Sequence, residues 1–153
     1  MNESAANASY FTFMFGDVSY AIEVTSVKEV LPYEKITPVP RAKEYMKGVM
    51  NIRGTVISVI DFRTLFGLPV KEPTKATSII VAEVEQEDAS ELSFGFIADD
   101  VSGVGPLEME PAGSGSKTPF VKMLGRTESG MVLILDMDKI FQFIEEDTEP
   151  KTK

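Results

Sequence analysis

The chain has 153 residues, a formal net charge of −9, and neither histidine nor cysteine. This length allows one domain or two small lobes with a shared core, and an apolar fraction of 43% is sufficient for a packed interior. The missing residue types exclude disulfides, Ser-His-Asp and Cys-His catalysis and most zinc sites. The excess of acidic residues argues against nucleic acid as a partner, because phosphate backbones are bound through Lys and Arg.

The N-terminal segment MNESAANAS is polar and acidic, unlike the basic and then apolar start of a secretion signal. No run in the chain approaches the roughly 18 apolar residues of a membrane span. We therefore expect a cytoplasmic protein without direct membrane insertion. Residues 1–9 are expected to form a flexible N-terminus and residues 10–145 the folded domain.

The first half of the chain predicts mainly strands. Alternation over residues 10–15 places three aromatic side chains on one face of a strand, namely Phe11, Phe13 and Phe15. Further β-type runs, rich in Val and Ile, follow at residues 19–24, 26–31, 48–52 and 55–60. Residues 41–47 favour one helical turn. Asp61 is placed to cap a short helix that Gly67 ends.

The second half repeats this character after a proline-containing connector at residues 68–77. It predicts strands at residues 78–84, 92–98, 101–104, 120–124 and 131–135. Residues 105–119 are rich in Gly, Ser and Pro, which is typical of a mobile surface loop. A helix is expected from about residue 136 to residue 145, followed by a charged tail at 146–153.

The two halves resemble each other over one short segment. The segment VIDFRTLF (59–66) aligns with ILDMDKIF (134–141), an apolar strand end followed by Asp and then by an apolar pair. Asp61 and Asp136 are equivalent in this alignment, which corresponds to an offset of 75 residues. The similarity predicts a mostly β fold built from two copies of a small barrel, each closed by an Asp-capped helical turn.

Acidic residues offer one alternative function. Asp99 with Asp100, or Asp136 with Asp138, could in principle hold a divalent cation or form part of a small-molecule site in a β-barrel. An Asp between a strand and a helix is more often a helix cap, so we regard this as the second hypothesis. The segment GSGSKT (113–118) is not a phosphate-binding loop, because no strand precedes it and Pro119 follows it.

Arg53 and Gly54 stand between two apolar runs in the segment GVMNIRGTVISVIDFRTLFG (48–67). One interpretation is an exposed arginine in a tight turn. The other is recognition, because Arg is enriched at interface hot spots and Gly lets another backbone approach closely. Glu29, beside the apolar Val27 and Val30, is the carboxylate expected to pair with Arg53 and to orient it.

The same segment resembles the signature of the bacterial chemotaxis coupling protein family, CheW. The resemblance runs from about Tyr10 to Phe143 and includes FTFMFGDVSYAIEVTSVKEV, ITPVPRAKEYMKGVMNIRG, FGFIADDVSGV and MVLILDMDKIF. Ile52 and Phe62 stand where the family usually has Leu, and Ser58 stands where Pro is common.

This resemblance implies a fold of two packed five-stranded SH3-like β-barrel subdomains with short helical turns and a C-terminal helix. The subdomain boundary would lie near residues 68–77, with some strands exchanged. It also implies an adaptor that is not an enzyme and needs no cofactor. Its partners would be the cytoplasmic tip of methyl-accepting chemoreceptors and the regulatory domain of the histidine kinase CheA, in arrays at the membrane.

Site residues can be carried over from the family only where this sequence matches it. The resemblance implies a receptor-binding set consisting of Val27, Glu29, Val30, Gly48, Arg53, Val101 and Val104. It also implies a kinase-binding set consisting of Phe11, Val24 and Val27. Val27 belongs to both sets.

Overall fold

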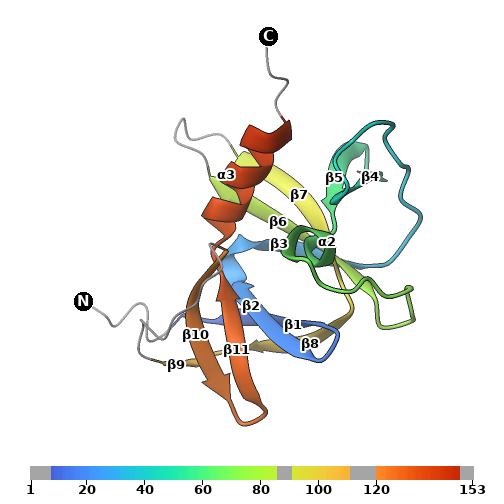
Figure 1. The fold of residues 1–153 in the computed structure, drawn as a ribbon. Helices are drawn as coiled ribbons and strands as arrows, with labels where there is room; N and C mark the ends of the chain where they lie inside the picture. Colours follow the sequence, from blue (N-terminus) through green and yellow to red (C-terminus); the bar gives the residue numbers. More distant parts are fainter. Residues whose placement is uncertain (1–7, 86–90, 111–119, 149–153) are drawn as a thin grey trace.

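The computed structural model of the chain describes residues 8–85, 91–110 and 120–148 (Figure 1). Two β-sheets make up most of these residues, and helices lie against them. Part of the loop predicted at residues 105–119, most of the predicted N-terminus and most of the predicted charged tail lie outside the described residues.

The lower sheet in Figure 1 has six strands in the order β8-β1-β2-β11-β10-β9. Their bounds are β1 (Tyr10–Phe15), β2 (Val18–Glu23), β8 (Asp100–Gly105), β9 (Glu108–Met109), β10 (Val121–Thr127) and β11 (Gly130–Leu135). Neighbouring strands are antiparallel except β2 and β11, which are parallel. The lower sheet therefore joins the first two strands of the chain to its last four.

The upper sheet has five strands in the order β3-β6-β7-β5-β4. Their bounds are β3 (Val27–Pro32), β4 (Met46–Ile52), β5 (Thr55–Ile60), β6 (Ser78–Glu85) and β7 (Glu91–Ala98). Here β5 and β7 are the parallel pair. The chain passes from the lower sheet to the upper one through the 3-10 turn η1 (Val24–Ser26), and it returns at Asp99, between β7 and β8.

Two helices follow equivalent strands, as the sequence predicts. Helix α2 (Phe62–Phe66) begins after Asp61, whose Oδ1 accepts a hydrogen bond from Arg63 N at 2.9 Å. It ends at Gly67, which has a φ of 77°. Helix α3 (Met137–Thr148) follows Asp136, whose Oδ1 accepts from Lys139 N at 3.1 Å. Both predicted caps and the C-terminal helix are confirmed, and α3 extends beyond the predicted end at residue 145.

The predicted helical turn at residues 41–47 is wrong. Arg41 has a φ of 63°, in the left-handed region, which no right-handed helical turn contains. Met46 N donates to Lys43 O in a tight turn, and β4 begins at Met46.

The similarity between the halves extends well beyond the segment that revealed it. In the β4–β5 hairpin Met46 pairs with Ile60, and in the β10–β11 hairpin Val121 pairs with Leu135, with a bulge directly after each pair. The backbone N–H of Asp61 donates to Tyr45 O at 2.7 Å, and that of Asp136 donates to Phe120 O at 2.8 Å. The offset of 75 residues therefore holds for both hairpins and for both helix starts.

The buried apolar side chains of the described residues form three clusters. One lies within the lower sheet and includes Tyr10 and Ile134, and a second lies within the upper sheet and includes Val59 and Ile79. The third is shared by the two sheets and the helices, and its aromatic members include Phe11, Phe13, Phe15, Tyr20, Phe62, Phe94, Phe96 and Phe141. The face predicted from the alternation in β1 is thus confirmed, because its three phenylalanines point into this shared core.

Candidate functional site

The β4–β5 turn presents Arg53 in an uncommon backbone conformation. Arg53 has a φ of 50° and Gly54 a φ of 87°, so both central residues of the turn are left-handed. The side chain of Asn51 supports the turn, since its Oδ1 accepts from Gly54 N at 2.9 Å. A positive φ is unusual for a residue other than glycine, and such strain is often retained where it serves a function.

The equivalent turn in the other half of the chain is built differently. It joins β10 to β11 through Glu128 and Ser129, with the same two-residue length. Glu128 is not among the residues with a positive φ, and Thr127 Oγ1 accepts from Ser129 N at 3.1 Å. The left-handed backbone conformation of Arg53 is therefore specific to the first hairpin, because a turn of two residues does not require it.

Arg53 and Glu29 form the ion pair that the sequence predicts. Arg53 Nη2 donates to Glu29 Oε1, and this hydrogen bond together with the charge of Glu29 raises the pKa of the guanidinium. The Arg53 side chain is nevertheless 70% exposed, while that of Glu29 is 22% exposed. Exposed pairs add little to folding stability, so the main effect of Glu29 is to hold an accessible cation in one place.

This ion pair also connects the two edges of the upper sheet. Glu29 lies on β3, at one edge, and Arg53 follows β4, at the other edge. The two residues can meet only if the sheet curves round on itself, as in a barrel. The pair therefore marks the seam at which the predicted first barrel closes.

The remaining residues of the predicted receptor-binding set lie on both sheets. Val30, on β3, is exposed, and Val27, at the start of β3, packs partly against the shared core. On β8, at the edge of the lower sheet, Val101 is half-buried and Val104 is 61% exposed. The set thus combines an exposed cation with exposed apolar side chains on an edge strand of each sheet.

Gly48 has an architectural role that the sequence did not indicate. Its φ is 151°, and a Cβ built there would lie 2.1 Å from the carbonyl oxygen of Thr37. Thr37 and Val49 exchange both backbone hydrogen bonds, at 2.9 and 2.8 Å, so the preceding loop lies directly against β4. Glycine at position 48 permits this close approach.

The predicted kinase-binding residues lie on β1 of the lower sheet and at the crossing from β2 to β3. Val24 opens η1 and Val27 follows it, and both are half-buried. Phe11 is only 6% exposed and belongs to the shared core. Its side chain offers little surface to a partner, and its main effect there is on packing.

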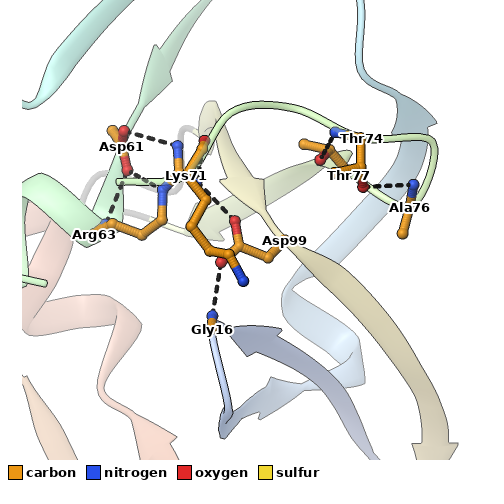
Figure 2. A network of polar contacts seen from close by, with 8 residues as sticks. All are labelled: Gly16, Asp61, Arg63, Lys71, Thr74, Ala76, Thr77 and Asp99. Carbon is orange, nitrogen blue, oxygen red and sulfur yellow. Dashed lines mark hydrogen bonds and ion pairs between the residues drawn. The ribbon is translucent and has the colours of Figure 1, made fainter. Parts of the chain in front are cut away.

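A buried polar network occupies the junction of the two sheets (Figure 2). Arg63 donates to Asp61 through Nε at 2.9 Å and through Nη2 at 3.0 Å, and to Asp99 Oδ1 through Nη1 at 2.7 Å. Nη1 also donates to Lys71 O at 3.2 Å. Asp99 Oδ2 accepts from Gly16 N at 2.7 Å, in the β1–β2 turn.

The charges in this network compensate one another. Burial by itself would lower the pKa of Arg63, but hydrogen bonding and charge attraction from Asp61, followed by those from Asp99, raise it. In the part of the chain that the structure describes, every buried side-chain nitrogen or oxygen has a hydrogen-bond partner. Sequence reasoning missed Arg63, although an arginine two positions after a capping Asp in an apolar segment is a usable signal.

The structure does not support the alternative that Asp99 and Asp136 form a metal or small-molecule site. Asp99 is held by Arg63 and by Gly16 N, and Asp136 caps α3. Among the described residues there is no group of three or more acidic side chains that could hold a metal ion. Both carboxylates are therefore used by the fold itself.

A cavity of about 520 Å³ lies away from the predicted binding residues. It is bounded by residues 39–43, by the ends of β4, β5 and β7, and by α3, with Ile60, Phe94 and Phe141 among its apolar lining. None of the predicted receptor-binding or kinase-binding residues lines it.

Of the helices in the described ranges, none has the length and apolar character needed to cross a membrane.

Comparison with known sequences decides the family. The profile of the CheW-like domain matches residues 9–145. The chain belongs to the CheW-like domain family. It acts as a scaffold in chemotaxis signalling, in agreement with the resemblance noted in its sequence.

Several CheW proteins resemble the chain over most of its length. The chemotaxis protein CheW of Bacillus subtilis is 31% identical, covering 84% of this chain and 83% of its own. That of Thermotoga maritima is 30% identical, covering 87% of each chain. The crystal structure of the scaffolding protein TtCheW from Thermoanaerobacter tengcongensis has a TM-score of 0.73 at 27% identity, covering 86% of this chain and 85% of its own. The mostly β fold predicted from the CheW resemblance is thereby confirmed.

Proposed function

We propose that this CheW-family chain couples the cytoplasmic tips of chemoreceptors to the regulatory domain of the histidine kinase CheA, without catalysing a reaction itself. It would work in the cytoplasm, recruited to receptor arrays at the membrane. The observation that supports receptor binding best is Arg53, an exposed cation fixed by Glu29 on a strained turn. Val30 and Val104 supply exposed apolar surface on the edge strands of the two sheets.

The charges favour a partner that presents a carboxylate. The chain as a whole carries −9, so a fixed and accessible guanidinium would discriminate among partner surfaces rather than attract acidic ones in general. Arginine is also the charged residue most suited to binding a carboxylate through two donors. We assign the kinase to the surface around Val24 and Val27, and the receptor tip to Arg53, Val30 and the edge of β8.

Mixing the purified chain with a receptor-tip fragment and with the CheA regulatory domain tests this proposal. We expect co-elution with each partner in size-exclusion chromatography. Replacing Arg53 by Asn removes the guanidinium while keeping a residue that tolerates a positive φ, and Arg53→Glu reverses the charge. Both variants should remain folded and should weaken receptor binding by about tenfold or more, as expected for an interface hot spot.

Arg126 provides a matched control. It lies on β10 in the equivalent hairpin, its side chain is also exposed, and it forms an ion pair with Glu110. Arg126→Glu should therefore leave receptor binding unchanged. A wild-type chain that co-elutes with neither partner would contradict the proposed function, and an Arg53→Asn variant that unfolds would assign Arg53 a structural role instead.

A further inference from the structure

Asp99 occupies the place where the chain returns from the upper sheet to the lower one. It is the single residue between β7, which lies in the upper sheet, and β8, which lies at the edge of the lower sheet. Its backbone N–H donates to Met14 O at 2.9 Å, which joins the crossing to the end of β1. Any rotation of one sheet relative to the other must therefore move Asp99 or its neighbours.

The Asp99 carboxylate connects both sheets directly. Oδ1 accepts from Arg63 Nη1 at 2.7 Å, on helix α2, which follows strand β5 of the upper sheet, and Oδ2 accepts from Gly16 N at 2.7 Å, in the β1–β2 turn of the lower sheet. Arg63 is in turn held by Asp61 through two hydrogen bonds. Figure 2 shows Arg63 between the two carboxylates, with Asp99 directed at Gly16.

The internal repeat shows that capping a helix does not require this arrangement. At the equivalent junction Asp136 caps α3 by accepting from Lys139 N, and the position equivalent to Arg63 is Asp138, an exposed acidic residue. The Arg63–Asp99 pair is therefore an addition made at only one of two equivalent junctions, and it links that junction to Asp99, where the chain changes sheets.

Its physical character also indicates a geometric role. A buried ion pair usually stabilises a fold no better than well-packed apolar residues of the same volume, because both charges must lose their hydration. Its hydrogen bonds are directional, however, and they hold only over a narrow range of distances and angles. We therefore expect a network that joins two sheets in this way to restrict their relative orientation more than apolar packing does.

We propose that Asp99, together with Arg63, is a positioning residue that sets the orientation of the two sheets. It would thereby fix the β8 surface of Val101 and Val104 relative to the β3 surface of Val30 and the Arg53–Glu29 pair. The consequence for receptor binding rests on the proposed function, whereas the effect on sheet orientation does not. Val101 is only two residues from Asp99, so the network acts directly on the first residue of the β8 surface.

The distance between the sheets can be measured directly, because the chain contains no cysteine. Spin labels would be attached to cysteines introduced at Val56 on β5 and at Met131 on β11, which are exposed and equivalent in the repeat. Pulsed electron paramagnetic resonance should give a narrow distance distribution for the otherwise wild-type chain. Asp99→Asn should broaden it, and should lower affinity for the receptor tip about tenfold if one conformation in ten remains competent.

Asp99→Asn is expected to fold, because Asn can still accept from Gly16 N and Arg63 retains Asp61. If it does not fold, Asp99→Glu replaces it, and its displaced carboxylate should shift the mean distance. Asp136→Asn, at the equivalent cap, is the control and should leave the distribution unchanged. A folded Asp99 variant with the wild-type distance distribution would overturn the proposal. Failure of the wild-type chain to bind the receptor tip would instead contradict the proposed function, and the distance measurement would still decide the role of Asp99.

Discussion

Two arginines on one short stretch of chain have opposite surroundings. Arg53 lies on a strained turn with most of its side chain in solvent, held by one carboxylate. Arg63 is buried and is held by two carboxylates and a backbone carbonyl. Exposure with a fixed position suits recognition, whereas full burial with complete pairing suits internal geometry. The sequence predicted the pairing of Arg53 with Glu29, which the structure confirms, and a recognition role for Arg53, which stays a prediction; it did not single out Arg63.

Tyr45 makes the stability of the fold depend on pH in the alkaline range. Burial, and then the hydrogen bond that its hydroxyl donates to Asp147 Oδ2 at 2.5 Å, raise the pKa of Tyr45. An unfolded chain loses the tyrosine proton near pH 10, before the folded chain does. The contribution is therefore complete below about pH 10 and is lost as the pH rises towards the pKa in the folded state.

We expect Tyr45→Phe to reduce the fall in unfolding free energy between about pH 9 and pH 11. Urea unfolding followed by circular dichroism at several pH values measures this fall. Some dependence should remain in the variant, because burial also raises the pKa of Tyr10 and of Tyr20. Parallel curves for the two proteins would show that Tyr45 does not contribute.

At the scale of elements, the two strand-to-helix junctions share a design but differ in burial. Each has an Asp that caps the following helix. The backbone N–H of each Asp donates to the carbonyl oxygen of the residue that precedes the first strand of the hairpin. Asp61 is fully buried and also pairs with Arg63, whereas Asp136 is only half-buried. The repeated cap was predictable from sequence, because a capping motif is local. Its burial was not, because it depends on the elements packed around α2.

Equivalent substitutions at these junctions should therefore have unequal costs. Asp136→Ala removes a helix cap and should lower the unfolding free energy by about 0.5–2 kcal/mol. Asp61→Ala also leaves Arg63 buried with an incomplete set of partners, and it should cost about 3–5 kcal/mol. Chemical unfolding of both variants gives the comparison, with Asp138→Ala on the exposed first turn of α3 as a control that should cost less. Equal costs at the two junctions would contradict the importance of the buried ion pair.

At the scale of the whole molecule, the repeating unit of the sequence coincides with neither of the two sheets. The upper sheet contains β3 to β7, and so takes strands from both sides of the connector at residues 68–77. The lower sheet combines β1 and β2 with strands from the end of the chain. Each half of the sequence therefore supplies strands to both sheets and side chains to the shared core.

Separate fragments of residues 1–72 and 73–153 should accordingly not fold alone. In the first fragment β1 would lack β8, β2 would lack β11, and β5 would lack β7, so only isolated hairpins would remain. Circular dichroism and proton NMR should show unfolded chains that regain structure when they are mixed. A chain cleaved between these residues after folding is the control and should stay folded. An independently folded fragment 1–72 would contradict this account.

Much of the fold and of the candidate site was determined by the sequence itself, because the determinants are local. The alternation of residues in β1 predicted which face carries its phenylalanines. Asp61 and Gly67 predicted the two ends of helix α2, and the dipeptide Arg53-Gly54 predicted the turn that carries the candidate recognition residue. Only the tertiary structure decided which strands share a sheet, that Gly48 lies against Thr37, and that Arg63 meets Asp99. These features join segments far apart in the chain, and no local pattern records how such segments pair or how deeply their charges are buried.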